Sequence, residues 1–159
     1  MTEPTISILP PTPLHVLEIW SNARDVAARF DIVLPPMGRS TSHEGLILIR
    51  FEPTVWLVEG DPAPLASLIG DDGALTAIGG GIARVRIAGP GWRTLLMEGG
   101  LFDAESPTFA PGCAAATIID HVAVRLWVES EDACLAYVPA SYAAGLVHFW
   151  GQALPSLAV

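Results

Sequence analysis

Residues 82–97 read IARVRIAGPGWRTLLM and change from a strand pattern to a helix pattern within a few positions. Residues 82–88 alternate, with arginines on one face and apolar side chains on the other, which is typical of a β-strand. Gly89-Pro90-Gly91 then favours a tight turn. This segment therefore predicts a strand followed directly by a helix over about 91–98.

The first half of the chain shows the same order of elements. Its expected elements are a strand over 14–20, a helix over 22–30 capped by Ser21, a polar loop over 35–44, strands over 45–51 and 54–59, a helix over 62–69 capped by Asp61, and a short strand over 74–78. Beyond residue 98 we expect a loop over 100–112, strands over 113–119, 122–129 and 133–138, and a last helix over 140–153.

This repetition predicts the fold class and the domain organisation. Strand-helix-strand-strand order is typical of ferredoxin-like α+β units. We predict an α+β fold of two pseudo-repeated ferredoxin-like βαββα units. The proline-rich residues 1–12 show no periodicity and are expected to form an extended arm. Residues 13–159 are expected to form a single domain, with halves of about 13–78 and 79–159.

Composition restricts the classes of partner. Charged residues make up 16% of the chain, against about 25% in an average protein, and hydrophobic residues make up 51%. The net charge is −9, and all eight basic residues are arginines. Such a field repels nucleic acids and anionic membranes. The sparse charge indicates that a protein partner covers part of the apolar surface, although small polar residues, glycine and proline are an alternative covering.

The start of the chain, Met-Thr-Glu-Pro-Thr, has no basic region and no apolar core of a signal peptide. The longest apolar runs are too short to span a bilayer. Cys113 and Cys134 lack metal-site or redox-motif spacing, so we expect reduced thiols. The expected compartment is the cytoplasm.

No motif predicts catalysis, cofactor binding or metal binding by this chain. Gly79-Gly80-Gly81 precedes a strand instead of a helix, so it lacks the geometry of a phosphate cradle. The four histidines lack metal-ligand spacing. Asp120-His121 could serve acid–base chemistry, but no nucleophile motif accompanies it.

The tryptophans give the remaining expectations about the core and about partner contacts. Trp20, Trp56 and Trp127 lie in expected strands and are predicted to be core residues. Trp92 and Trp150 lie in expected helices, and each is interpreted either as a core residue or as a contact with another subunit. Phe109, in the loop 104–112, and Trp150 are predicted partner contacts because no strand dictates their packing.

Several short runs together resemble a known family. They are Gly89–Leu96, Phe102-Asp103, Phe109–Cys113, Val124–Trp127, Val138–Tyr142 and Phe149-Trp150, with Leu34-Pro35-Pro36 and Trp56-Leu57-Val58 in the first half. Their order and spacing resemble the gamma subunit of heterotetrameric sarcosine oxidase, most closely over residues 80–153.

The resemblance implies a fold like the folate-binding domain of aminomethyltransferases. It also implies a non-catalytic subunit that packs against larger subunits, which hold FAD, FMN, NAD and tetrahydrofolate and oxidise sarcosine or a related N-methyl amine. An isolated subunit of this kind is expected to self-associate. The alternative function is a stand-alone folate-binding or aminomethyltransferase-like protein, which the fold would permit.

Overall fold

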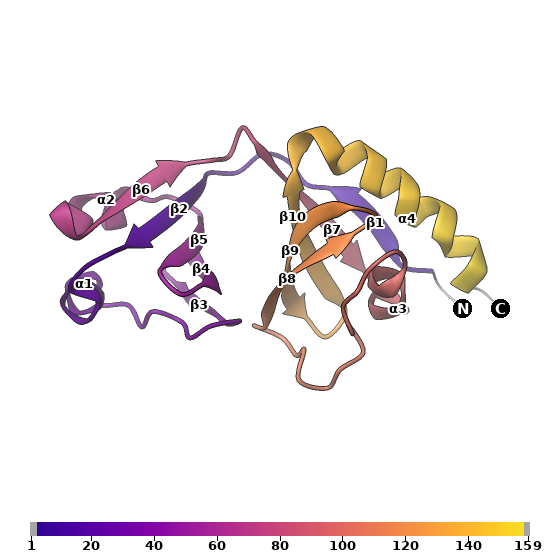
Figure 1. The fold of residues 1–159 in the computed structure, drawn as a ribbon, viewed down its shortest axis with the longest axis horizontal. Helices are drawn as coiled ribbons and strands as arrows, with labels where there is room; N and C mark the ends of the chain where they lie inside the picture. Colours follow the sequence, from indigo (N-terminus) through magenta and orange to yellow (C-terminus); the bar gives the residue numbers. More distant parts are fainter. Residues whose placement is uncertain (1–2, 158–159) are drawn as a thin grey trace. The chain divides into compact units, whose positions relative to one another are not determined.

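The computed structural model describes residues 3–157 and divides the chain into two compact units (Figure 1). The first-half unit is Thr12–Gly79. Among the described residues, the second-half unit contains residues 80–157 together with residues 3–11. Each unit has one five-stranded antiparallel sheet with helices on one face, so the predicted α+β class with two repeated units is confirmed.

The first-half unit has the sheet order β3-β4-β5-β2-β6. Its elements, in chain order, are β2 (Leu14–Ile19), α1 (Ala23–Phe30), β3 (Ser40–His43), β4 (Leu46–Glu52), β5 (Val55–Glu59), α2 (Ala63–Ile69), the 3-10 turn Gly70–Asp72 and β6 (Gly73–Ala77). The N-cap position of α2 is Pro62, one residue after the predicted cap Asp61, and the Asp61 Oδ1 accepts a 3.0 Å hydrogen bond from the backbone N–H of Ala63.

The second-half unit has the sheet order β1-β7-β10-β9-β8. Its elements are β1 (Thr5–Ile8), β7 (Ile82–Ala88), α3 (Trp92–Met97), β8 (Ala114–Ile119), β9 (Val122–Ser130), β10 (Ala133–Pro139), the 3-10 turn Ala140–Tyr142 and α4 (Ala143–Leu157). The predicted strand, turn and helix over 82–98 are therefore present as β7 and α3.

The two sheets have the same topology except for the origin of one edge strand. In the first-half unit, that strand is β6, which follows α2 and pairs with β2. In the second-half unit the equivalent place beside β7 is taken by β1, with Thr5 opposite Ala88 and Ile8 opposite Val85. Residues 5–8 of the expected arm thus complete a sheet whose other strands begin more than seventy residues later.

The core of the first-half unit lies between its sheet and its helices. α1 contains alanines that favour a helix, and its Asp25 and Arg29 lie at the ends that the helix dipole favours. Val26 and Phe30, one turn apart, point into the core. They pack with the side chains Leu17, Ile19, Ile32, Leu46, Leu48, Trp56, Val58, Leu65 and Ile69.

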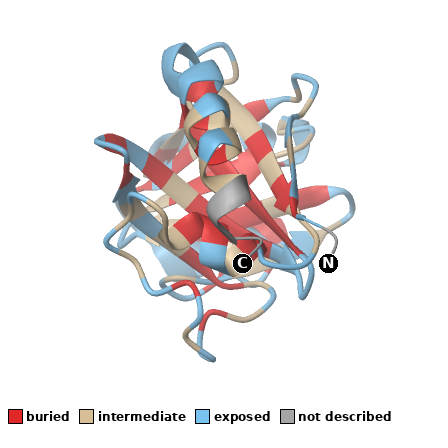
Figure 2. Cartoon of the chain, turned by 90° about the vertical axis from the view of Figure 1, so that its right-hand side faces the viewer, coloured by how far each residue is buried: buried red, intermediate tan, exposed pale blue. Residues whose placement is uncertain are grey.

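The core of the second-half unit lies between its sheet, α3 and α4. Leu95 and Leu96 of α3, with Leu146 and Trp150 of α4, are almost completely buried. Alternate residues of the central strands face them, among them Val85, Ile87, Val124, Leu126, Val128, Cys134, Ala136 and Val138. Figure 2 shows exposed residues on the outer side of α4, with buried residues on the strands behind it.

Two local predictions were wrong. Residues 40–43 lie in the segment predicted as a polar loop, but they form β3, paired with β4 so that Ser40 faces Ile49. Polar side chains are tolerated there because β3 is an edge strand. Ser21 does not cap α1; the N-cap is Asn22, in the left-handed conformation at φ 49°, and the Ser21 hydroxyl lies 2.7 Å from a carboxylate oxygen of Asp72.

The prediction that Trp20 is a core residue was also wrong. β2 ends at Ile19, and the Trp20 side chain is 62% exposed with its Nε1 donating to the Asp71 carbonyl at 3.1 Å. The other four tryptophans are buried, which confirms the core prediction for Trp56 and Trp127.

Candidate functional site

The helix-free face of the second-half sheet carries three of the eight arginines. The strand register places Tyr137 between Arg84 and Arg125 on this face. Arg84 donates to the Pro10 carbonyl at 2.7 Å, and Arg86 forms an ion pair with Glu129 at 2.7 Å. The guanidinium groups of Arg84 and Arg86 therefore connect segments that are distant in the sequence.

Arg93, the second residue of α3, anchors the long loop between α3 and β8. Its guanidinium donates to the carbonyls of Ala104 at 2.7 Å and Phe109 at 2.8 Å. The same group lies over the Trp92 ring, 4.3 Å from the ring centroid. Phe109 packs edge-to-face on Phe102 with centroids 4.7 Å apart. Arg93 thus fixes this loop against α3.

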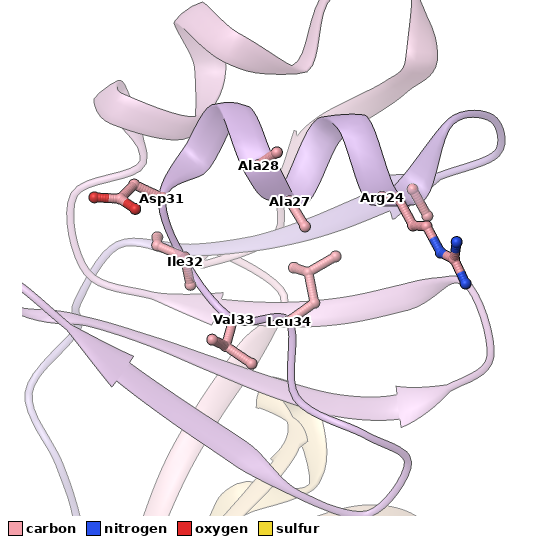
Figure 3. A pocket seen from close by; sticks show the side chains of 8 residues that line it. Arg24, Ala27, Ala28, Asp31, Ile32, Val33 and Leu34 are labelled. Atoms are coloured by element: carbon pink, nitrogen blue, oxygen red, sulfur yellow. The ribbon is translucent and has the colours of Figure 1, made fainter.

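A hollow of about 530 Å³ lies beside α1 in the first-half unit (Figure 3). It is lined by Ala23, Arg24, Ala27, Ala28, Asp31, Ile32, Val33 and Leu34. Arg24 and Asp31 lie at opposite ends of this row, with Ala27 and Leu34 between them. Val33 is 77% exposed. The lining is therefore mostly apolar and bounded by one cation and one anion, which suits a protein segment better than a small polar substrate.

The two residues predicted as partner contacts lie inside their own unit. Phe109 is 5% exposed and Trp150 is 0% exposed, and both belong to the second-half core. Their role in an assembly stays a prediction. Sequence reasoning did not find the hollow beside α1. The available signal was the presence of three small residues in α1, Ala23, Ala27 and Ala28, which leave room beside the helix.

Asp120 and His121 form the turn between β8 and β9. Both have positive φ angles, 46° and 65°, and Ile119 pairs with Val122 directly before and after them. Two positive φ values in a two-residue hairpin define a type I′ turn, and Asp is one of the residues that adopt positive φ most readily. The turn therefore explains the presence of Asp120 at this place without a catalytic role.

The surroundings of Cys134 and Asp72 displace the pKa values of these two side chains in opposite directions. Burial raises the pKa of the Cys134 thiol to about 12. Hydrogen bonds from Ser21, Asn22 and Arg29 hold the pKa of Asp72 below its ordinary value of 3.8.

No group of three potential metal-ligating side chains occurs among residues 3–157. Within the same range, no helix has both the length and the apolar composition that crossing a bilayer requires.

Comparison with known proteins identifies the fold. No protein-family model and no curated protein matches the sequence. Among solved structures, a chain of heterotetrameric sarcosine oxidase from Corynebacterium sp. U-96 is similar, with a TM-score of 0.87 and 19% identity over 98% of this chain and 86% of that chain. Aminomethyltransferase T of the glycine cleavage system from Bartonella henselae is similar with a TM-score of 0.70 and 18% identity.

The likeness to aminomethyltransferase T covers nearly all of this chain but less than half of the other. It covers 93% of this chain but 45% of the aminomethyltransferase chain. Identities below 20% leave the shared fold as the firm result of both comparisons. The chain therefore has the fold that this sarcosine oxidase chain shares with part of the aminomethyltransferase, as the resemblance in sequence led us to expect.

Proposed function

We propose that this chain is a non-catalytic structural subunit of a sarcosine-oxidase-like flavoprotein complex. The observation that carries the proposal is the likeness to a sarcosine oxidase chain over 98% of this chain and 86% of the other. A likeness across nearly the whole of both chains suits an equivalent subunit better than a shared module. In the proposed complex, partner subunits hold FAD, FMN, NAD and tetrahydrofolate and oxidise sarcosine or a related N-methyl amine.

The surface of the chain supports this proposal. Large apolar side chains are strongly exposed in both units, including Leu101 at 93%, Val33 at 77% and Trp20 at 62%. Charged residues are few, at 16% of the chain. Partner subunits would cover part of this apolar surface, and its exposure in the isolated chain favours self-association.

We also propose that the complex is cytoplasmic. The two cysteines are buried thiols whose Sγ atoms donate to backbone carbonyls, Cys113 to Thr108 at 3.1 Å and Cys134 to Leu135 at 3.6 Å. Such thiols suit a reducing compartment.

The proposal is tested by tagging the chain in its native cells and identifying the proteins that co-purify. We expect a larger flavin-containing subunit in fixed ratio to this chain, with sarcosine- or N-methyl-amine-dependent reduction of its flavin. Purification of the chain without any stoichiometric partner would contradict the proposal.

A second candidate is a stand-alone folate-binding protein. The likeness to aminomethyltransferase T favours it, because the matched part covers 93% of this chain. The test is a titration of the isolated chain with tetrahydrofolate, in which binding is detected by tryptophan fluorescence or by calorimetry. Saturable micromolar binding by a chain that recovers no protein partner would favour this candidate over the subunit.

A further inference from the structure

The repeated architecture makes α1 and α3 equivalent helices. Each follows the first strand of its half and is preceded by a residue in the left-handed conformation, Asn22 at φ 49° and Gly91 at φ 81°. Counting from these residues, Arg24 and Arg93 are both the second residue of their helix. Two positions later, Val26 and Leu95 are both 0% exposed. The two arginines therefore occupy the same position in the repeat.

The surroundings of the two arginines differ. Beside α3, the loop of residues 98–113 passes close enough for Arg93 to donate to the carbonyls of Ala104 and Phe109. This loop also places the apolar ring of Phe109 in the core of its unit. Beside α1, the equivalent connection is shorter, residues 31–39, and no described residue accepts a hydrogen bond from Arg24. The hollow lined by Arg24, Ala27 and Val33 is found at this place.

We propose that the hollow beside α1 binds a loop of the partner subunit, in the way that residues 104–109 of this chain lie against α3. This inference rests on the proposed function, because it names the surface by which the subunit docks. The partner loop places one aliphatic or aromatic side chain over Ala27, Ala28 and Leu34. Its backbone carbonyls or a carboxylate accept hydrogen bonds from Arg24.

The charges at the two ends of the hollow define the chemistry of the partner loop. Arg24 is a cation with five N–H donors, so oxygen acceptors complement it. Asp31 is acceptor-only when ionised, so a backbone N–H or a basic side chain complements it. Both side chains are exposed and make no hydrogen bond or ion pair among the described residues. The apolar floor between them excludes water only when an apolar side chain covers it.

The test uses the complex recovered with the tagged full-length chain. One variant, Arg24→Gln, removes the cation, and a second, Ala28→Trp, fills the hollow. The matched control, Ala66→Trp, adds the same ring to an exposed position of α2 outside the hollow. Circular dichroism of each purified chain verifies folding. Hydrogen exchange of residues 23–34 is compared between the free chain and the complex.

We expect Arg24→Gln and Ala28→Trp each to weaken partner binding by about tenfold or more, the effect of losing one central contact. Ala66→Trp should bind normally, and residues 23–34 should exchange more slowly in the complex. Normal binding by both hollow variants, with unchanged exchange at 23–34, would overturn the inference while the recovered partner still supports the proposed function. Failure of the unchanged chain to recover any partner would refute the proposed function and the inference with it.

Discussion

Replacing Arg93 by methionine isolates what the loop anchor contributes to stability. Methionine keeps most of the apolar stem but removes the hydrogen bonds to the carbonyls of Ala104 and Phe109, at 2.7 and 2.8 Å. A hydrogen bond to a charged group contributes about 1.5–3 kcal/mol. Allowing for water replacing part of the loss, we expect the Arg93→Met variant to lose about 3 kcal/mol of unfolding free energy.

The assay is urea unfolding followed by circular dichroism. With a slope of about 2 kcal/mol per molar urea, the midpoint should fall by about 1.5 M. Arg24→Met is the matched control, because Arg24 occupies the equivalent position in α1 and donates no hydrogen bond among the described residues. It should stay within about 0.5 kcal/mol of the unchanged chain. Equal losses from the two variants would refute the claim that the loop distinguishes the two arginines.

Three further predictions concern stability and reactivity. Gly73→Ala should destabilise the chain by about 1–3 kcal/mol because the new Cβ would lie 2.1 Å from the Glu18 carbonyl oxygen. Gly80→Ala is the control, because there is open space around Gly80, and thermal unfolding should show no change in its stability. The lowered pKa of Asp72 means that its carboxylate stabilises the fold above the unfolded pKa and loses this effect as pH falls through the folded pKa. Asp72→Asn should therefore lower the melting temperature at pH 7, and the difference should shrink below about pH 4; a constant difference would contradict this. Cys134, with a pKa of about 12, should resist thiol reagents at pH 8 until urea unfolds the chain, as mass spectrometry of the labelled peptide would show.

The elements predicted best were those whose own residues show a periodic apolar face. The alternation in residues 82–88 and in 122–129 identified β7 and β9, because each strand must bury one side. The helical spacing of Val26 and Phe30 identified α1 in the same way. The repeat of these elements then predicted two similar units.

The elements that sequence reasoning missed depend on distant partners. β1 is short, lies among prolines, and becomes a strand by pairing with β7, about eighty residues away. β3 has four small or polar residues and no apolar face, so only its pairing with β4 defines it. Trp20 has strong strand propensity, but the chain leaves the sheet one residue earlier.

The candidate site was predictable only in part. The sequence analysis found no catalytic motif and predicted partner contacts at Phe109 and Trp150, which stay predictions, whereas the hollow beside α1 was not predicted. Burial depends on which loops are long enough to fold back over a helix. The loop after α3 folds back and buries its own Phe109, whereas the shorter connection after α1 leaves Arg24 and Val33 at the surface. The equivalent positions of α1 and α3 therefore differ in burial because different loops fold back beside them, which the residues of each helix do not indicate.

The proposal that this chain is a subunit of a flavoprotein complex is tested by its native mass in an untreated lysate of its own cells. Size-exclusion chromatography with immunodetection and flavin absorbance measures it without a tag. We expect the 16.8 kDa chain to elute in a much larger, flavin-containing particle. Elution at the mass of the chain alone, with flavin elsewhere in the profile, would contradict the proposed role as a subunit of a flavoprotein complex.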